Sequence, residues 1–481
     1  MFLNYYIFKK ERLEKEDIIL DMQRIFIQFK KEIIEANLPD NIEILSTNQP
    51  SLLSNPAVAI QKALENSIAS PSLDRIIEQK LERNPKAKAV VVISDNTRPV
   101  PYKGESGILW PIIEKLLSHN ISKERILILV ATGTHRPLSE KELRQMIDPR
   151  VFNYNIPIKN HDCEDKDNLT YLGKTNRGSL IYINRDYIEA DIKILTGLVE
   201  THFMAGASGG RKSICPGLIG KESIYIFHGA PMLASPKASD LIIDENPCHQ
   251  EALEVAKKVG VDYIVNVTLN QNFKLTGVFA GDLEEAHKQA VNYIAKNVAI
   301  PLEKKYDIVI THAGFVGVNH YQAAKAAVVA IPALKTGSKL IMIANNTDID
   351  LIGSKNYRQV LSLFKSIGVK KFTQLILSPK WKFIPDQWQV QMWARLFSKI
   401  PQENFIYYSP RISPEDYKII PGIDGNMFLP MDKRYKGTLR DIPQIIENII
   451  NEIDKEFKKK GKKEVNIAFL KDGPYGVPIE V

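Results

Sequence analysis

Cysteine is scarce in this sequence, and long apolar segments are missing. The 481 residues include three cysteines, Cys163, Cys215 and Cys248, which lie far apart. An odd, scattered set cannot form the disulfide framework of a small secreted protein and is typical of a reducing compartment. No apolar run reaches the roughly 18 residues of a membrane-spanning helix, and the N-terminal segment is too charged after residue 8 for a signal peptide. We therefore expect a cytoplasmic protein with no membrane partner.

The usual signatures of zinc and nucleic-acid binding are also missing. No pair of the nine histidines has the H-E-x-x-H spacing, and no Cys/His group has the spacing of a closed zinc site. The net charge is 64 − 56 = +8, with the basic residues spread along the chain and densest at 455–463. They are not interleaved with aromatic residues in the manner of a nucleic-acid-binding surface. A solvated basic surface explains the charge, and we expect no nucleic-acid partner.

What is present is the composition of an ordinary globular protein. Apolar residues make up 44% and charged residues 25%, and at roughly 150 residues per domain the chain has room for about two to four domains. Short β-branched runs alternate with helical stretches, which indicates parallel sheets covered by helices on both faces. The runs lie at 87–94, 125–130, 190–196, 306–311, 339–344 and 465–470. The predicted fold class is α/β, with two domains of mainly parallel sheets flanked by helices and the active site in the cleft between the domains.

The domain boundaries follow from where these units begin and end. Residues 1–38 are predicted to be a charged extension that becomes helical, because apolar residues recur at helical spacing from 18 to 34. A long helix over 282–297 closes one unit, and a new strand–loop–helix unit starts at residue 304. We expect an N-terminal cofactor-binding domain over 39–300, completed by the returning segment 464–481, and a C-terminal substrate or lid domain over 301–463.

Polar clusters follow four of the predicted strands. Ligands of open α/β sheets bind beyond the carboxyl ends of the strands, so four clusters together favour a shared cleft over ordinary turn chemistry. The clusters are DNTRP (95–99), TGTHRP (132–137), GLVETH (197–202) and HAGFVGVNHYQ (312–322). Among the histidines, His135, His202 and His228 are candidates for acid–base chemistry or for a lone metal ligand; taken singly, each has a hydrogen-bonded structural role as its alternative.

The segment 200–220 (ETHFMAGASGGRKSICPGLIG) has the glycines of an anion-binding loop. Glycines at 206, 209 and 210 let the backbone approach a phosphate, and a helix expected to begin near Ser213 would add its N-terminal dipole. The loop is not a Walker A motif, because Arg211 stands where that pattern needs glycine. Lys212, once desolvated, could bond covalently to an acyl or carbonyl group; a simple counter-charge for phosphate is the open alternative.

With these residues laid out, the chain resembles the lactate racemase family that uses a nickel-pincer nucleotide. The matching motifs cover most of the chain from about residue 85 to the end, and their order and spacing agree with the family. They are SDNTRP (94–99), ATGTHRP (131–137), GLVETHFMAGASGGRKSICPG (197–217), SIYIFHG (223–229), NPCHQE (246–251), YQAAKA (321–326), DQWQ (386–389) and DGPYGVP (472–478).

The resemblance implies a role for each matching residue. The cofactor would be nickel in a pyridinium-3-thioamide-5-thiocarboxylic acid mononucleotide, carried covalently by Lys212, with His228 as the protein ligand to nickel. His135 and His202 would be the general acid/bases. The residues expected to hold the cofactor or its phosphate are Asp95, Ser208, Gly209, Gly210, Arg211 and Ser213, and those expected around the substrate are Arg98, Tyr321, Gln322, Lys325 and Trp388.

The implied activity is racemisation or epimerisation of a 2-hydroxy acid, lactate or a larger one. Reversible removal of hydride from C2 gives a planar 2-keto acid, and hydride can return to either face. The two enantiomers present their hydroxyl groups on different sides, so two bases are needed, and imidazoles suit that task. An arginine fork suits the carboxylate. Proteins that synthesise the cofactor are the implied partners, beside the small-molecule substrate.

One loop departs from the family pattern. Residues 314–320 read GFVGVNH, lack the usual Pro-Leu-Asp piece and form a loop one residue shorter. This loop borders the expected substrate lysine, so the identity of the substrate stays open. Two other functions also remain open, a nucleotide-phosphate-binding transferase and a non-catalytic cofactor-binding protein, each using the Gly-Gly-Arg-Lys loop over 209–212 as an anion site.

Overall fold

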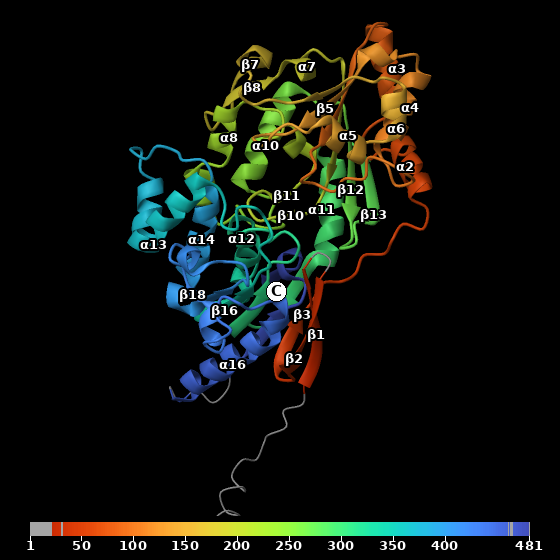
Figure 1. The fold of residues 1–481 in the computed structure, drawn as a ribbon. Helices are drawn as coiled ribbons and strands as arrows, with labels where there is room; N and C mark the ends of the chain where they lie inside the picture. Colours follow the sequence, from red (N-terminus) through yellow and green to blue (C-terminus); the bar gives the residue numbers. More distant parts are fainter. Residues whose placement is uncertain (1–21, 30–31, 460, 462–464, 481) are drawn as a thin grey trace, which may run out of the picture.

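The protein is represented by a computed structural model that describes residues 22–29, 32–459, 461 and 465–480. Two lobes, each built on a six-stranded sheet, lie one above the other in Figure 1. The predicted α/β class with two mainly parallel sheets is confirmed. Within the described residues, no helix is both long and apolar enough to cross a membrane.

The first sheet lies in the upper lobe and has the strand order β13-β12-β9-β4-β5-β6. All neighbours are parallel except the pair β12–β13. Its central strands are continuous apolar runs because helices cover both faces. The strands are β4 (Ala89–Ser94), β5 (Ile126–Ala131), β6 (Ile158–Asn160), β9 (Ile192–Leu198), β12 (Tyr263–Leu269) and β13 (Leu275–Gly281); a separate hairpin pairs β7 (Leu169–Lys174) with β8 (Leu180–Asn184).

The helices of the upper lobe are mostly short, and several begin at a side-chain cap. Asn246, for example, accepts hydrogen bonds from the first backbone N–H groups of α10. The helices are α2 (Pro56–Glu65), α3 (Leu73–Arg83), α4 (Leu109–Ser118), α5 (Glu140–Met146), α6 (Pro149–Asn153), α7 (Arg185–Ile188), α8 (Lys221–Phe227), α9 (Ala230–Leu233), α10 (Pro247–Val259) and α11 (Glu285–Val298). The long helix predicted over 282–297 corresponds to α11.

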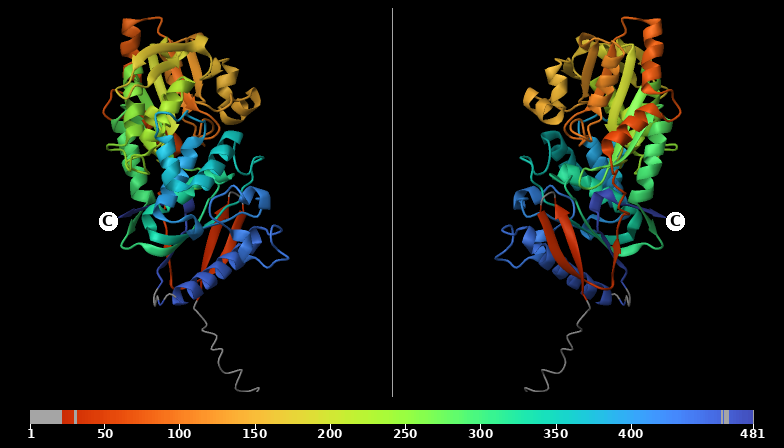
Figure 2. Two further views of the ribbon diagram at one scale, coloured as in Figure 1. Left: turned by 90° about the vertical axis from the view of Figure 1, so that its left-hand side faces the viewer. Right: turned by 90° about the vertical axis from the view of Figure 1, so that its right-hand side faces the viewer.

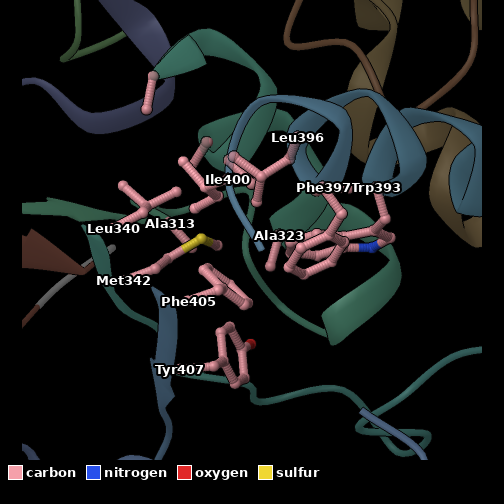
Figure 3. Packing of buried hydrophobic residues seen from close by; sticks show 14 of the residues in the cluster. Ala313, Ala323, Leu340, Met342, Trp393, Leu396, Phe397, Ile400, Phe405 and Tyr407 are labelled. Carbon is pink, nitrogen blue, oxygen red and sulfur yellow. The ribbon is translucent and has the colours of Figure 1, made fainter. Parts of the chain in front are cut away.

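The second sheet is parallel throughout and has the order β18-β17-β16-β15-β19-β3. Figure 3 shows one of its two cores, where Trp393 and Phe397 of α14 pack on Phe405 and Tyr407 of β17. The strands are β3 (Ile42–Leu45), β15 (Tyr306–His312), β16 (Leu334–Ile343), β17 (Phe405–Tyr408), β18 (Ile423–Asp424) and β19 (Ile467–Leu470). The helices are α12 (His320–Val329), α13 (Lys355–Ile376), α14 (Gln387–Lys399), α15 (Pro414–Tyr417) and α16 (Ile442–Lys459).

The predicted N-terminal helix is wrong in its described part. The strands β1 (Met22–Phe29) and β2 (Glu32–Pro39) pair as an antiparallel hairpin, which lies beside α16 in both views of Figure 2. Ile25, Ile27 and Phe29 alternate with exposed residues and bury one face of the hairpin against the isoleucines of α16. Because every second residue is buried in this way, the segment forms a strand and not the helix that the spacing also allowed. The rest of the predicted extension, residues 1–21, lies outside the described residues.

The prediction that residues 464–481 return to the first domain is also wrong for the main strand of this segment, β19 (Ile467–Leu470). β19 inserts between β15 and β3 in the second sheet. The chain reaches β19 from α16, which packs on that sheet, so the nearest strand to pair with is β15. β3 belongs to the same sheet, so this sheet also takes residues from the predicted 39–300 domain. The last strand, β20 (Val477–Glu480), pairs with β14 (Ala299–Leu302) at the crossing between the lobes.

Candidate active site

The predicted site residues come together between the lobes, beyond the carboxyl ends of β4, β5 and β9. Asp95 and Arg98 follow β4, and His135 follows β5. His202 follows β9 in a two-residue strand, β10 (Thr201–His202), that pairs with β11 (Gly206–Ala207) and lies between the lobes in Figure 1. Lys212 lies close enough that its charge acts on His202. This arrangement agrees with the cleft expected from the polar ends of the strands.

His135 is held by a buried carboxylate. Its Nδ1 lies 2.6 Å from Oδ2 of Asp95, which is 4% exposed, while its own ring is mostly exposed. Burial alone would raise the pKa of Asp95, but hydrogen bonds from His135 and Thr97 outweigh it and hold that pKa below its usual value. An ionised Asp95 accepts the proton on Nδ1, so the lone pair of His135 lies on Nε2. Asp95, which we expected to hold the cofactor, therefore orients a histidine.

His202 is held in the opposite way. Its Nδ1 accepts the backbone N–H groups of Met204 and Ala205, each at 3.2 Å. An accepting Nδ1 leaves the ring proton on Nε2. Burial, followed by the positive charges of Lys212 and Arg98, holds the pKa of His202 well below its usual range. His202 is thus a neutral ring that presents an N–H, whereas His135 presents a lone pair.

The buried side chain of Arg211 stabilises the glycine-rich loop through hydrogen bonds. Its guanidinium is 1% exposed, donates to the carbonyl oxygen of Ala205 at 2.8 Å and lies 2.7 Å from Nε2 of His287. Burial lowers the pKa of Arg211 to about 9. The side chain is committed to these contacts in place of the phosphate contact that we expected. The two alternative functions, a transferase and a non-catalytic cofactor-binding protein, both need this loop as an anion site. The buried position of Arg211 removes the main argument for them.

The other polar side chains of the loop also serve the protein's own backbone. The Ser208 hydroxyl donates to the carbonyl of Leu198 at 2.7 Å, and the Ser213 hydroxyl donates to that of Thr196 at 3.0 Å. The N–H of Gly210 donates to Oδ1 of Asn266 at 2.9 Å. The helix expected near Ser213 is a single 3-10 turn, η3 (Gly210–Ser213), and the next α-helix begins at Lys221. Gly209 adopts φ 76°, and a Cβ there would lie 2.6 Å from Val199, so packing alone requires this glycine.

Lys212 is the one basic side chain of this loop that faces the site. Within the described part of the chain, its Nζ has no hydrogen bond or ion pair and lies 6.0 Å from the centroid of the Phe227 ring. Burial, then the charges of Arg98 and Arg211, holds the pKa of Lys212 well below its usual value. A lowered pKa increases the fraction of the uncharged amine, which is the nucleophilic form of lysine.

His228 ends α8 and turns its ring towards the second lobe. Its Nδ1 lies 3.2 Å from the carbonyl oxygen of Ile224, which can only accept, so Nδ1 carries the proton and Nε2 carries the lone pair. The ring stacks on Trp388 with centroids 4.8 Å apart, and burial lowers its pKa to about 3. A neutral ring with one fixed tautomer is the form in which histidine binds a metal.

The residues predicted around the substrate come from α12 and α14. Tyr321 and Gln322 occupy the first turn of α12, and Lys325 lies one turn later. The indole N–H of Trp388 donates to the hydroxyl of Tyr321 at 2.7 Å. Burial, with a further contribution from the nearby Arg98, lowers the pKa of Lys325 to about 8. Arg98 and Lys325 thus place two cations beside His202.

Two carboxylates and a tyrosine of the site were not predicted to be functional. Oε1 of Glu200 lies 3.4 Å from Nε of Arg98, and Asp240 accepts the Thr201 hydroxyl. Burial raises the pKa of Asp240 to about 6. Glu200 and Tyr475 lie in motifs that match the family, whereas Asp240 lies in none of the matching motifs. All three line a cleft of about 600 Å³.

Comparisons with known proteins point to one family. Residues 29–240 match the family model of the lactate racemase N-terminal domain, and residues 302–414 match that of the lactate racemase C-terminal domain. The chain is 32% identical to the lactate racemase of Lactiplantibacillus plantarum over 82% of this chain and 90% of the relative. It is 30% identical to that of Thermoanaerobacterium thermosaccharolyticum over 78% of this chain and 86% of the relative.

A solved structure supports the same assignment. The lactate racemase apoprotein from Thermoanaerobacterium thermosaccharolyticum superposes with a TM-score of 0.79 at 25% identity, covering 95% of this chain and all of that one. Fold, sequence and the two domain models therefore agree: the chain belongs to the lactate racemase family and is an isomerase of the racemase type.

Proposed function

We propose that this protein racemises or epimerises a 2-hydroxy acid, lactate or a larger acid, with a nickel-pincer nucleotide attached to Lys212. The observation that carries the proposal is a lysine without a hydrogen-bond partner in the described structure, Lys212, whose charge acts on both His202 and His228. The names of the relatives, lactate racemases, support a substrate with the lactate skeleton. The three cysteines are buried and unpaired, which suits the cytoplasm that we propose as its location.

The residues present fit such a cofactor. Lys212 offers an amine without a hydrogen-bond partner in the described structure, which suits a covalent link. His228 offers a lone pair on Nε2. Within the described residues, no group of three or more His, Cys, Asp or Glu side chains could hold a metal, so a nickel ion on His228 would take its remaining ligands from the bound nucleotide. The nucleotide would supply a ring carbon that accepts and returns hydride.

The chain's own residues bind the acid and handle its proton. Arg98 and Lys325 provide two cations for the substrate carboxylate, with the planar fork of Arg98 suited to bidentate binding. Nε2 of His135 takes the hydroxyl proton of one enantiomer, and the carboxylate of Asp95 stabilises the cationic ring that results. The position of the site between the two lobes would limit the access of water to the keto form of the substrate.

His202 serves the other face of the substrate. Its Nε2–H would donate a hydrogen bond to the substrate oxygen, because Nδ1 is occupied by two backbone N–H groups. Before Nε2 can accept a proton, the ring proton must move from Nε2 to Nδ1, which breaks these two contacts. The two histidines therefore differ in their resting state, and we expect kcat for the two directions of racemisation to depend differently on pH.

Chiral analysis with intact-mass measurement tests the proposal. Protein co-produced with cofactor-synthesis proteins should convert a single enantiomer of a 2-hydroxy acid to a racemate and should carry an added mass that Lys212→Ala abolishes. Lys221→Ala, a matched change on a partly exposed lysine, should retain both the mass and the activity. Full racemase activity in Lys212→Ala, or in protein free of nickel, would overturn the proposal.

A further inference from the structure

The cleft beside the substrate anchors is much larger than a lactate side chain requires. It encloses about 600 Å³, and Arg98, His202 and Lys325 lie in its wall. Lys212 and His228 are not part of that wall, so this space is additional to the space around the proposed cofactor. Volumes of about 300–1,000 Å³ are typical of sites for drug-sized ligands. The side chain of lactate is a single methyl group and would leave most of the cleft to water.

An aromatic wall lies in this cleft. Phe315 stacks on Tyr475 with ring centroids 5.0 Å apart and planes 14° apart, and Phe273 meets Phe315 edge-on at 5.4 Å. The wall spans both lobes, because Phe273 follows β12 of the first sheet whereas Phe315 follows β15 of the second. Aromatic rings prefer these stacked and edge-to-face arrangements, which a further ring can extend.

Tyr475 fixes the shortened loop that carries Phe315. Its hydroxyl accepts the backbone N–H groups of Phe315 at 3.1 Å and of Val316 at 3.3 Å. Gly314 has φ 55°, and a Cβ there would lie 2.8 Å from the tyrosine ring. The part of the chain that departs from the family pattern therefore holds Phe315 in one position on the wall.

The aromatic wall begins close to the carboxylate anchor. Burial raises the pKa of Tyr475, and the charge of Glu200, which contacts Arg98, raises it further. The cleft also extends to the outer face of the N-terminal hairpin. Phe26 and Ile33 on that face are 50% and 61% exposed, so this end of the cleft is apolar surface open to solvent.

We propose that the substrate is a 2-hydroxy acid whose side chain ends in an aromatic ring, with the carboxylate on Arg98 and Lys325 and the ring against Phe315 and Phe273. This inference rests on the proposed racemase function and adds the substrate class. A ring in the cleft covers apolar surface that a methyl group leaves in water, and removal of apolar surface from water favours binding.

Turnover by the holoenzyme tests the substrate class. The kcat/KM for 3-phenyllactate should exceed that for lactate by about 10-fold or more, and that for 2-hydroxyhexanoate, which lacks a ring, should lie between them. Phe273→Ala, on an exposed turn where the change is tolerated, should lower the ratio of kcat/KM for 3-phenyllactate over lactate by about 10-fold. Tyr171→Ala, a matched change on an exposed aromatic residue outside the cleft, should leave that ratio unchanged.

Binding to the cofactor-free protein separates this inference from the proposed function. Calorimetry should show tighter binding of 3-phenyllactate than of lactate, and Phe273→Ala should reduce the difference. If 3-phenyllactate binds tighter but no 2-hydroxy acid is racemised, the proposed function falls and the substrate preference stands. If lactate is racemised in preference, or Phe273→Ala leaves the selectivity unchanged, the substrate class is overturned while the racemase function stands. If the cofactor-free protein binds neither acid and the holoenzyme racemises neither, both proposals fall.

Discussion

Replacement of Asp95 by asparagine is the sharpest probe of how the site sets up its base. The Asp95 carboxylate lies 2.6 Å from Nδ1 of His135 and is its charged partner. A hydrogen bond to a charged group contributes about 1.5–3 kcal/mol, which corresponds to about 10- to 150-fold in an equilibrium. An asparagine amide can also donate to Nδ1, which would move the ring proton to Nε2 and remove the base. General acid–base catalysis contributes about 10²–10⁴-fold, so we expect kcat to fall by about that factor.

The assay is the initial rate of racemisation from each pure enantiomer, with the cofactor mass measured on the same samples. KM should change little, because Arg98 and Lys325 remain. Thr97→Val is the matched control: it removes the 2.6 Å bond from the Thr97 hydroxyl to Asp95 but leaves His135 in place, and should cost less than 10-fold. The reasoning is refuted if Asp95→Asn keeps a near-normal kcat. Loss of the cofactor mass in this variant would instead return Asp95 to the cofactor-holding role implied by the family resemblance.

The same aspartate links the site to stability. Its pKa in the folded protein lies below the usual value. Its ionised form therefore adds stability above the unfolded pKa of about 4, and this contribution is lost as the pH falls through the folded pKa. The difference in unfolding free energy between the native chain and Asp95→Asn should shrink on acidification, as measured by urea unfolding over a series of pH values.

Three further outcomes are expected. Lys325, with a pKa of about 8, loses its charge as the pH rises through that value, so KM should rise in alkaline solution; Lys325→Arg should remove that rise in initial-rate profiles. Trp388→Phe removes the indole N–H and weakens the stack on His228, so nickel retained after dialysis against a chelator should fall severalfold while the fold, followed by circular dichroism, is unchanged. Ile27→Ala, at a fully buried position of the hairpin, should lower the free energy of unfolding by about 2–5 kcal/mol in urea titrations. The control Phe26→Ala, on the exposed face of the hairpin, should lower it by less than about 1 kcal/mol.

The arrangement of the site could be predicted from the sequence because it follows from topology. Buried parallel strands are continuous apolar runs, and the polar residues that follow them must meet at one edge of the sheet. That rule alone brings Asp95, His135 and His202 together, and the structure places them so. It does not give ring protons, which depend on whether Nδ1 meets a carboxylate, as in His135, or backbone N–H groups, as in His202.

The errors have a common cause, which is tertiary contact. Ile25 and Phe29 fit helical spacing as well as strand alternation, and only packing on α16 decides for the hairpin. Arg211 follows two glycines of positive φ, so its direction depends on the pocket formed by Ala205 and His287, which are distant from each other in sequence. Asp240 belongs to no motif and reaches the cleft through its contact with Thr201.

The fate of the hydrogen on C2 tests the central claim most directly. Racemisation of a single enantiomer is run in D₂O with the holoenzyme, and the product is examined by NMR. If the hydrogen leaves and returns as hydride while the two histidines exchange only the hydroxyl proton, both enantiomers should keep protium at C2. Deuterium at C2, appearing as fast as the inverted product, would show that a base removes that hydrogen as a proton and would contradict the account.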